Sequence, residues 1–478
     1  MTQPILIDNA LICTDRTTSP GSVLVRDGAI AAVAWFAEDR AALRQHAAEI
    51  VPAAGRWLMP GLIDAHSHGY SALLRGTENS LPLETWALYT TLYGRAYDGE
   101  ALHTAILLGA AERIRGGITG TLDHSPMMHL GSVAIAAHEQ SGLRVAYAPF
   151  LHDMSDYDLL GIRLPPALAA IIGGPPPLAA DSYSRSFAAF VQAARAGSGR
   201  VQVQLGPNAP QRCSLAAWAL WRTLRDRHDV AVHTHLLETR EQESLNRRWP
   251  GGLVAEMARA GMLEGRLTCA HGIWLTDAER TVLAIHDVTV SHNPASNLML
   301  GSGVMPLRSC TACGLRLALG TDSANTGGRH DLFGVMRLAM MLPRVQSPVR
   351  EWPRAAEIFA LATQGGAAAL GLRDRVGRIA KGQLADLVLV RAEDPGTIAG
   401  EPSLDSLVQH AGPENVDAVM VGGNWVFRDG RILAFDEDAV RQDAARIARQ
   451  LQARVARKLP ILASALPEIA ARLDRVCA

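Results

Sequence analysis

The sequence predicts an α/β protein: a (β/α)8 TIM-type barrel with a small β-sandwich domain built from both chain ends. Strand-like runs alternate with helical patterns through the middle of the chain, whereas both ends hold short β-rich runs broken by Gly and Asp. The chain has 478 residues, of which 48% are hydrophobic, which is enough for one large core and a smaller one. We expect residues 1–58 and 373–435 to form the β-sandwich, 59–372 the barrel, and 436–478 a C-terminal helical segment.

The barrel prediction depends on eight candidate strands in the central region. They are residues 61–66, 119–123, 145–150, 201–205, 230–235, 267–271, 288–292 and 317–322. Helical patterns at 100–115, 216–228 and 355–370 separate or follow these strands, as expected for repeated βα units. A six-stranded doubly wound sheet is the alternative, but no Gly-x-Gly-x-x-Gly motif follows the first strand.

Two connections are too long for tight βα loops, namely residues 70–95 and 152–177. Long loops at the carboxyl ends of barrel strands usually cover a substrate. We therefore expect both segments to act as lids.

His66 and His68 lie at the end of the first predicted strand. Residues two apart in a strand share a face, so the two imidazoles can converge on one point. Paired imidazoles at this spacing suit Zn²⁺ or Fe²⁺.

Four later strands also end in a polar residue: His235, His271, His292 and Asp322. In a barrel these strand ends meet at one face, where active sites lie. His233 points the same way as His235, but we prefer His235 as a ligand because it is nearer the rim and Glu238 follows it. We expect His233 to lie one layer deeper in the barrel interior.

These motifs resemble the amidohydrolase superfamily over nearly the whole chain. The matching stretches are PGLIDAHSH (60–68), HLLET (235–239), AH (270–271), SHNPASN (291–297), GTD (320–322) and GQLADLV (382–388). They look most like the branch that contains the cytosine, guanine and adenosylhomocysteine deaminases and the s-triazine hydrolases. The resemblance implies one divalent metal, Zn²⁺ or alternatively Fe²⁺, with the ligands His66, His68, His235 and Asp322. It also implies catalytic roles for Glu238, His271 and Asp322.

The lysine content independently favours a single metal. Another branch of the superfamily bridges two metals with a carboxylated lysine on the fourth strand. Here the fourth predicted strand reads VQVQL, and the two lysines, Lys381 and Lys458, both lie beyond the barrel strands. That bridge cannot form in this barrel.

The implied reaction is hydrolytic deamination of a purine, pyrimidine, pterin or triazine-like ring. Asp322 would take a proton from water, Glu238 would protonate the ring nitrogen, and His271 would orient the nucleophile. Loss of chloride or an alkylamine from a triazine-like ring, or cleavage of another non-peptide C–N bond, is the alternative. An inactive barrel serving as an assembly protein should lack some of the ligands, and all four are present.

Several further residues lie on or near the predicted pocket loops. The tentative substrate contacts are Arg75, His124, His152, Asn208, His292 and Asn297. Asn208 stands where deaminases of adenosine-like substrates carry a histidine. The resemblance therefore supports a nucleoside substrate less than it supports other ring substrates.

The bulk composition indicates a small-molecule substrate rather than a macromolecular one. The net charge is −1 and no basic run is present, which argues against nucleic acid. We find neither a signal peptide nor an apolar run long enough to cross a membrane, and the six cysteines are scattered. We therefore expect a cytoplasmic enzyme without membrane partners, and a homo-oligomer, since the β domain and long loops offer surfaces.

Overall fold

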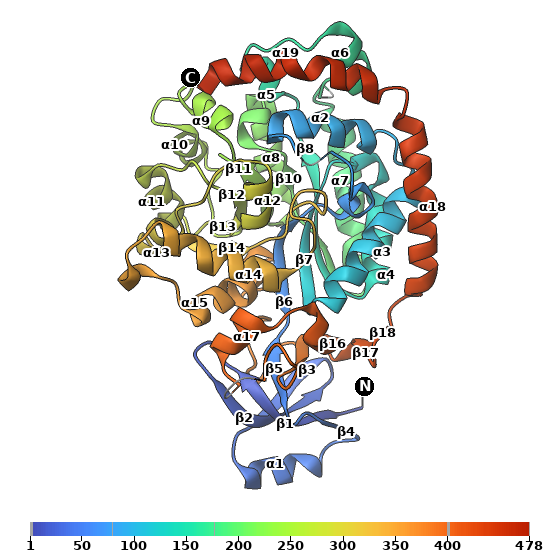
Figure 1. Cartoon of the computed structure of the whole chain (residues 1–478), viewed down its shortest axis with the longest axis vertical. Coiled ribbons are helices and arrows are strands. Elements are labelled where there is room, and N and C mark those ends of the chain that lie inside the picture. The colour runs from blue at the N-terminus through green and yellow to red at the C-terminus, as the bar shows by residue number, and fades with distance from the viewer. Residues whose placement is uncertain (1–2, 79, 176, 399–401, 478) are drawn as a thin grey trace.

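A computed structural model describes residues 3–78, 80–175, 177–398 and 402–477. A mixed β-sheet lies at one end of the molecule, a larger α/β region fills the centre, and the last helix crosses the opposite end (Figure 1). The fold is α/β with parallel central sheets, as the sequence predicts.

The terminal sheet combines strands from both ends of the chain. Its order is β18-β17-β16-β15-β5-β1-β2-β3, with β4 paired to β1. The strands are β1 (Ile5–Cys13), β2 (Thr18–Arg26), β3 (Ala29–Ala34), β4 (Glu49–Pro52), β5 (Arg56–Pro60), β15 (Leu387–Arg391), β16 (Val416–Val421), β17 (Asn424–Arg428) and β18 (Arg431–Ile432). β5 and β15 run antiparallel with Leu58 opposite Leu389, and this pairing joins the two chain ends. One face buries its own apolar cluster, which includes Ile7, Val23 and Met420. The short helices α1 (Ala37–Arg44) and α17 (Leu404–His410) belong to the same two stretches of chain.

The central region contains two parallel sheets of strands. One has the order β10-β8-β7-β6, with β9 also on β8, and the other has the order β11-β12-β13-β14. The strands are β6 (Leu62–Ser67), β7 (Ile118–Ser125), β8 (Arg144–Leu151), β9 (Val201–Val203), β10 (Gly206–Pro207), β11 (Val232–Leu236), β12 (Leu267–His271), β13 (Thr289–His292) and β14 (Arg316–Leu319). Isolated parallel bridges join Leu205 to Val232 and Ser67 to Asp322. Both edges of one sheet therefore contact both edges of the other, and all carboxyl ends face the same side.

Helices follow most of these strands and bury apolar residues against them. They are α2 (Leu83–Gly94), α3 (Gly99–Arg115), α4 (Gly131–Ser141), α5 (Asp156–Leu159), α6 (Pro166–Ile172), α7 (Ala180–Ala196), α8 (Leu215–His228), α9 (Arg240–Asn246), α10 (Leu253–Arg259), α11 (Asp277–Ile285), α12 (Pro294–Met299), α13 (Leu307–Ala312), α14 (Leu332–Met341), α15 (Ala355–Ala360) and α16 (Gly366–Ala369). Side chains cap several N-termini: Asp98 accepts the N–H of Ala101 at the start of α3, and Thr276 forms a capping box with Glu279 at α11. These contacts satisfy backbone donors that a helix start leaves unpaired.

The eighth predicted strand, 317–322, is too long by three residues at its carboxyl end. The observed β14 ends at Leu319, and Asp322 has a φ of 61°, in the left-handed region. Gly320 makes this turn possible, because a Cβ there would lie 2.4 Å from Oδ1 of Asn293 and 2.9 Å from the backbone nitrogen of His66. The chain thus leaves the strand just before the carboxylate.

The predicted helix 355–370 is interrupted. A π-helical turn at Leu361–Gly365 separates α15 from α16. At Gly365 a Cβ would lie 2.2 Å from the carbonyl oxygen of Leu317, and at Gly366 one would lie 2.5 Å from Cβ of Ile63. The backbone therefore packs directly onto two strands, and the π turn accompanies this close approach.

Two long helices end the chain, α18 (Glu437–Val455) and α19 (Leu459–Cys477). α18 packs against α3, and α19 crosses the far end of the molecule against α2, α6 and α9 (Figure 1). Among the described residues, we find no helix with the length and apolar character needed to span a membrane.

Candidate metal centre

Three imidazoles and one carboxylate converge at the carboxyl ends of the central strands. Nε2 of His66 lies 3.3 Å from Oδ1 of Asp322, and Nε2 of His68 lies 3.2 Å from the same oxygen. Nε2 of His235 lies 3.4 Å from Nε2 of His68. All four side chains are buried. The structure thus brings together the four residues that the sequence analysis named as ligands.

The outer nitrogen of each imidazole is held by a hydrogen bond. Nδ1 of His68 donates to the carbonyl oxygen of His124 at 2.5 Å, and Nδ1 of His235 donates to that of Asn208 at 2.6 Å. Nδ1 of His66 lies 2.8 Å from Nε2 of His233 in a third hydrogen bond. Such bonds fix both the orientation and the tautomer of a ring, and they leave the Nε2 lone pairs facing one another.

This donor set fits a divalent cation. Nε2 of His66 is buried and has no hydrogen-bond partner among the described residues. Burial lowers the pKa of the His66 imidazole to about 4, so its lone pair is free near neutral pH. Burial opposes ionisation of Asp322, but its contacts with His66, His68 and His271 outweigh burial and hold that pKa well below its usual range. Neutral imidazoles with a carboxylate are a ligand set typical of zinc or iron.

Glu238 and His271 lie beside the four candidate ligands. Nε2 of His271 is 3.6 Å from Oε2 of Glu238 and 3.9 Å from Oδ2 of Asp322. Burial, reinforced by the negative charge of Asp322, raises the pKa of Glu238 to about 8. Nδ1 of His271 donates to Oδ1 of Asn297 at 2.9 Å, so Nε2 is the nitrogen that faces the carboxylates.

The backbone is strained at or next to the residues that carry these side chains. Leu237, His271 and Asp322 have φ values of 43°, 75° and 61°, a region that residues other than glycine rarely adopt. The turn at Leu237 brings Glu238 back towards His271. Strained residues of this kind cluster at functional sites, where the surrounding structure holds them.

A buried polar network supports the turn that carries Asp322. Asp64 accepts the N–H of Thr321 at 2.8 Å, the Thr321 hydroxyl at 2.7 Å and Nε of Arg113 at 3.2 Å. His330 contacts both Thr321, with Nδ1 2.8 Å from Oγ1, and Arg113. This network was not predicted from the sequence. The signal for Asp64 was its position two residues before His66 on the same strand face, but nothing local marks Arg113 or His330.

A second buried network supports the segment after His68. Asp123 accepts the N–H of Gly69 at 2.7 Å and Nε2 of His138 at 2.8 Å. Asp123 lies on β7 and His138 on α4, so the turn after β6 is held by the next βα unit.

Comparison with known proteins identifies the family. The sequence profile of the Amidohydrolase family matches residues 57–426. This chain belongs to the amidohydrolase family. It is 32% identical over 451 residues to the 5'-deoxyadenosine deaminase of Methanothermobacter thermautotrophicus, covering 94% of this chain and 99% of that relative. The crystal structure of an adenosine deaminase from Xanthomonas campestris with bound zinc is similar, with a TM-score of 0.83, 27% identity, and coverage of 95% of this chain and 98% of that one. An atrazine chlorohydrolase from Arthrobacter aurescens complexed with zinc has the same fold, with a TM-score of 0.80, 20% identity, and coverage of 93% and 100%.

Three of the tentative substrate contacts lie against the proposed ligands of this amidohydrolase or against His271. The ring of His124 stacks on that of His68, with centroids 6.0 Å apart. Asn208 supplies the carbonyl oxygen that holds His235, and its side-chain oxygen accepts Nη1 of Arg212 at 2.8 Å. Asn297 holds His271, as described above. These contacts give the three residues partners within the protein.

The other three tentative contacts are spread more widely. His292 is buried at the end of β13, and its Nδ1 has no partner among the described residues. His152 is half-buried near Phe150, and burial lowers its pKa to about 4. Arg75 pairs with Glu112 on α3, and this ion pair occupies its guanidinium.

The two long connections contact each other and the loops of the site. Apart from residues 79 and 176, which lie outside the described residues, they contain α2, α5 and α6. The Tyr157 hydroxyl donates to the carbonyl oxygen of Glu84, and Nη2 of Arg212 donates to Asp156 at 2.5 Å. Glu84 also accepts the hydroxyl of Thr239, so one segment meets a residue after β11 and the other a residue after β10, at the same end as the candidate metal centre.

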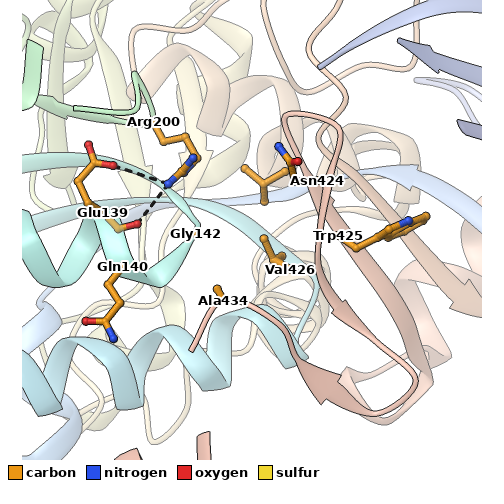
Figure 2. Close-up of a pocket in the computed structure, with 9 residues that line it drawn as sticks. Glu139, Gln140, Gly142, Arg200, Asn424, Trp425, Val426 and Ala434 are labelled. Carbon is orange, nitrogen blue, oxygen red and sulfur yellow. Dashed lines mark hydrogen bonds and ion pairs between the residues drawn. The ribbon is translucent and has the colours of Figure 1, made fainter. Parts of the chain in front are cut away.

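A separate hollow of about 380 Å³ lies where α4 meets the β16–β17 hairpin, as Figure 2 shows. Its lining includes Trp425, Asn424 and an ion pair in which Arg200 and Glu139 approach to 3.7 Å. None of the proposed metal ligands lines it, so the chemistry of this amidohydrolase is not centred there.

Proposed function

We propose that this amidohydrolase is a metal-dependent hydrolase that deaminates an aminated N-heterocycle and releases ammonia. The observation that carries the proposal is the position of Glu238 and His271 beside three converging imidazoles and the Asp322 carboxylate. A buried carboxyl with a raised pKa is suited to deliver a proton next to a cation site. The relatives named 5'-deoxyadenosine deaminase and adenosine deaminase favour a purine among the possible rings.

We also propose one divalent metal ion, bound by His66, His68, His235 and Asp322. Zinc is preferred to iron because the similar adenosine deaminase structure has bound zinc. A bound divalent cation lowers the pKa of water to about 7 and so supplies a nucleophile at neutral pH.

The side chains then divide the proton transfers. Asp322, which its low pKa keeps ionised, would accept the proton that the water gives up. Glu238 donates a proton to the ring nitrogen next to the amino-bearing carbon, which makes that carbon more electrophilic. The proton that Asp322 took from water then passes to the departing amine, and Glu238 recovers a proton from the new hydroxyl as the ring carbonyl forms and ammonia leaves. His271, held by Asn297 through Nδ1, directs Nε2 at the attacking oxygen.

The fold proposal follows from the strand pairing. We infer that the parallel strands of residues 59–372 form a (β/α)8 barrel, because the two bridges join both pairs of sheet edges. Residues 1–58 and 373–435 would form the composite β-sandwich domain, supported by their separate apolar cluster, and 436–478 the helical segment.

The test is a screen of aminated purines, pyrimidines, pterins and triazines with the purified holoenzyme. We expect the best substrate to release ammonia in an amount equal to the ring carbonyl product. Glu238→Gln, which retains the side-chain shape without the acid, is the matched control. Release of chloride, an alkylamine or an acyclic carboxylate without ammonia would instead support the triazine-type or amide-type alternative. Activity on each aminated purine should also be compared with activity on its nucleoside. Asn208 stands where deaminases of adenosine-like substrates carry a histidine, so this comparison tests its effect.

The proposed partner is a small molecule. We further propose a homo-oligomer, which light scattering of the purified protein would test directly.

A further inference from the structure

A chain of hydrogen bonds connects lid helix α2 to the backbone of Glu238. The Thr239 hydroxyl donates to Oε1 of Glu84 at 2.6 Å. Oγ1 of Thr239 also accepts the N–H of Gln242 at 3.3 Å, which caps the first turn of α9. Oε1 of Gln242 in turn accepts the N–H of Glu238 at 2.9 Å. Three bonds thus lead from the lid to the residue that donates the proton.

Every member of this chain is removed from water. The exposed fractions are 6% for Glu84, 4% for Thr239, 2% for Gln242 and 3% for Glu238. Loss of one partner leaves a buried polar group unpaired, and water cannot replace it without opening the structure. The hydrogen-bond chain can therefore fix the geometry of the loop that carries Glu238.

The loop needs such support because its backbone is strained. Leu237, directly before Glu238, has a φ of 43°. A β-strand end that turns through this region keeps its conformation only when its neighbours hold it. The capped start of α9 supplies one anchor, and Glu84 holds the cap from the other side.

We propose that Glu84 is a positioning residue, which fixes Glu238 through Thr239 and so couples helix α2 to the placement of the proton donor. The inference rests on the proposed function of Glu238. Among the described residues, no hydrogen bond or ion pair joins Glu84 to the candidate metal ligands. Glu84 is 155 residues from Thr239 in sequence, so local structure does not require their pairing.

The surroundings of Glu84 agree with this role. The second lid also reaches it, because the Tyr157 hydroxyl donates to the Glu84 carbonyl oxygen. Helix α19 packs on both α2 and α9, the two elements that the hydrogen-bond chain connects. Helix α2 is already anchored by the buried side chains Leu88 and Leu92, so its packing does not depend on a carboxyl group.

Burial, together with the negative charge of Glu241, raises the pKa of Glu84 to about 8. The side chain is then a neutral acid near pH 7, and glutamine is its closest neutral counterpart. Glu84→Gln therefore preserves an oxygen that can accept the Thr239 hydroxyl, whereas Glu84→Ala and Thr239→Val remove the bond. Thr85→Ala is a matched control, because Thr85 is equally buried on the same helix but donates to the Pro82 carbonyl oxygen instead.

The experiment measures turnover, bound metal and amide hydrogen exchange for these variants. A misplaced reacting group costs about 100-fold per ångström, so we expect kcat to fall about 10- to 100-fold in Glu84→Ala and Thr239→Val. The double variant should lose no more than the worse single variant, and Glu84→Gln and Thr85→Ala should stay within about threefold of wild type, since neither breaks the chain. Metal content should not change.

Hydrogen exchange separates this inference from the proposed reaction. Glu84→Ala removes the bond to Thr239 and should speed exchange of the Glu238 amide hydrogen, whereas Glu84→Gln should not. This measurement does not require a known substrate. Unchanged exchange in Glu84→Ala, or additive losses of kcat in the double variant, would overturn the positioning role. Faster exchange without any ammonia-releasing substrate would support the positioning role and count against the proposed reaction.

Discussion

His233 offers a sharp test of which histidines bind the metal. The side chain is fully buried, and its Nε2 lies 2.8 Å from Nδ1 of His66. Its pKa is well below the usual range because of burial and the neighbouring histidines, so it is neutral and can accept a hydrogen bond. We predict that His233→Leu keeps the metal site but weakens it.

The size of the effect follows from the lost bond. Removing an outer partner of a metal-binding histidine typically costs 10- to 100-fold in affinity. That corresponds to about 1.4 to 2.7 kcal/mol. The unpaired Nδ1–H of His66, with no exposed surface, would also lower the free energy of unfolding by about 1 to 3 kcal/mol. His235→Ala should instead abolish tight binding, because it removes a proposed ligand.

The assay is a competitive zinc titration against a chromophoric chelator, with the metal content of the purified protein as a second measurement. His233→Gln is the matched control, since its side-chain oxygen can still accept from His66. If His233→Leu loses the metal while His235→Ala retains the metal, the predicted strand register is wrong by two residues. Wild-type affinity in His233→Leu would equally refute the proposed contribution of the bond.

Three further predictions can be tested on the same protein. Elemental analysis should find close to one zinc or iron per chain, and two tightly bound ions that are both needed for activity would contradict the single site. Glu238→Gln should keep the metal and lose about 10²- to 10⁴-fold in turnover, as measured by ammonia release, because the ligands of the metal ion remain but the proton donor is gone. Glu84 has a folded pKa of about 8 against an ordinary value of 4.5, so the folded protein holds its proton more tightly. Its stabilising contribution is complete below pH 4.5 and is lost as pH rises through 8, so denaturation of wild type should show a loss of stability over that range that Glu84→Gln lacks.

The strand pattern and the histidine spacing were accessible from the sequence because each is local. The eight predicted strands all overlap observed ones, and His66, His68, His235 and Asp322 stand at or close to their carboxyl ends. The end of β14 was misplaced because a close approach of Gly320 to His66, from the other end of the central region, decides it.

The supporting residues could not be predicted for the same physical reason. Arg113 lies in an apolar helix and His330 in a loop, and only the folded chain brings both to Thr321. Glu84 looks in the sequence like an ordinary acidic residue in the first turn of a helix, and its partner is far along the chain. Contacts between distant segments have no periodicity or spacing to mark them.

The composite terminal sheet has a consequence for biosynthesis. β5 pairs with β15 through Leu58 and Leu389, which are 331 residues apart. At a synthesis rate of about 5 to 20 residues per second, the first strands wait about 20 to 70 s on the ribosome before their partners exist. During that interval Trp57, Leu58 and Met59, all fully buried in the finished protein, have no completed sheet to cover them. An exposed apolar strand edge is prone to aggregation, so we expect the nascent chain of this amidohydrolase to carry this risk until β15 has been synthesised.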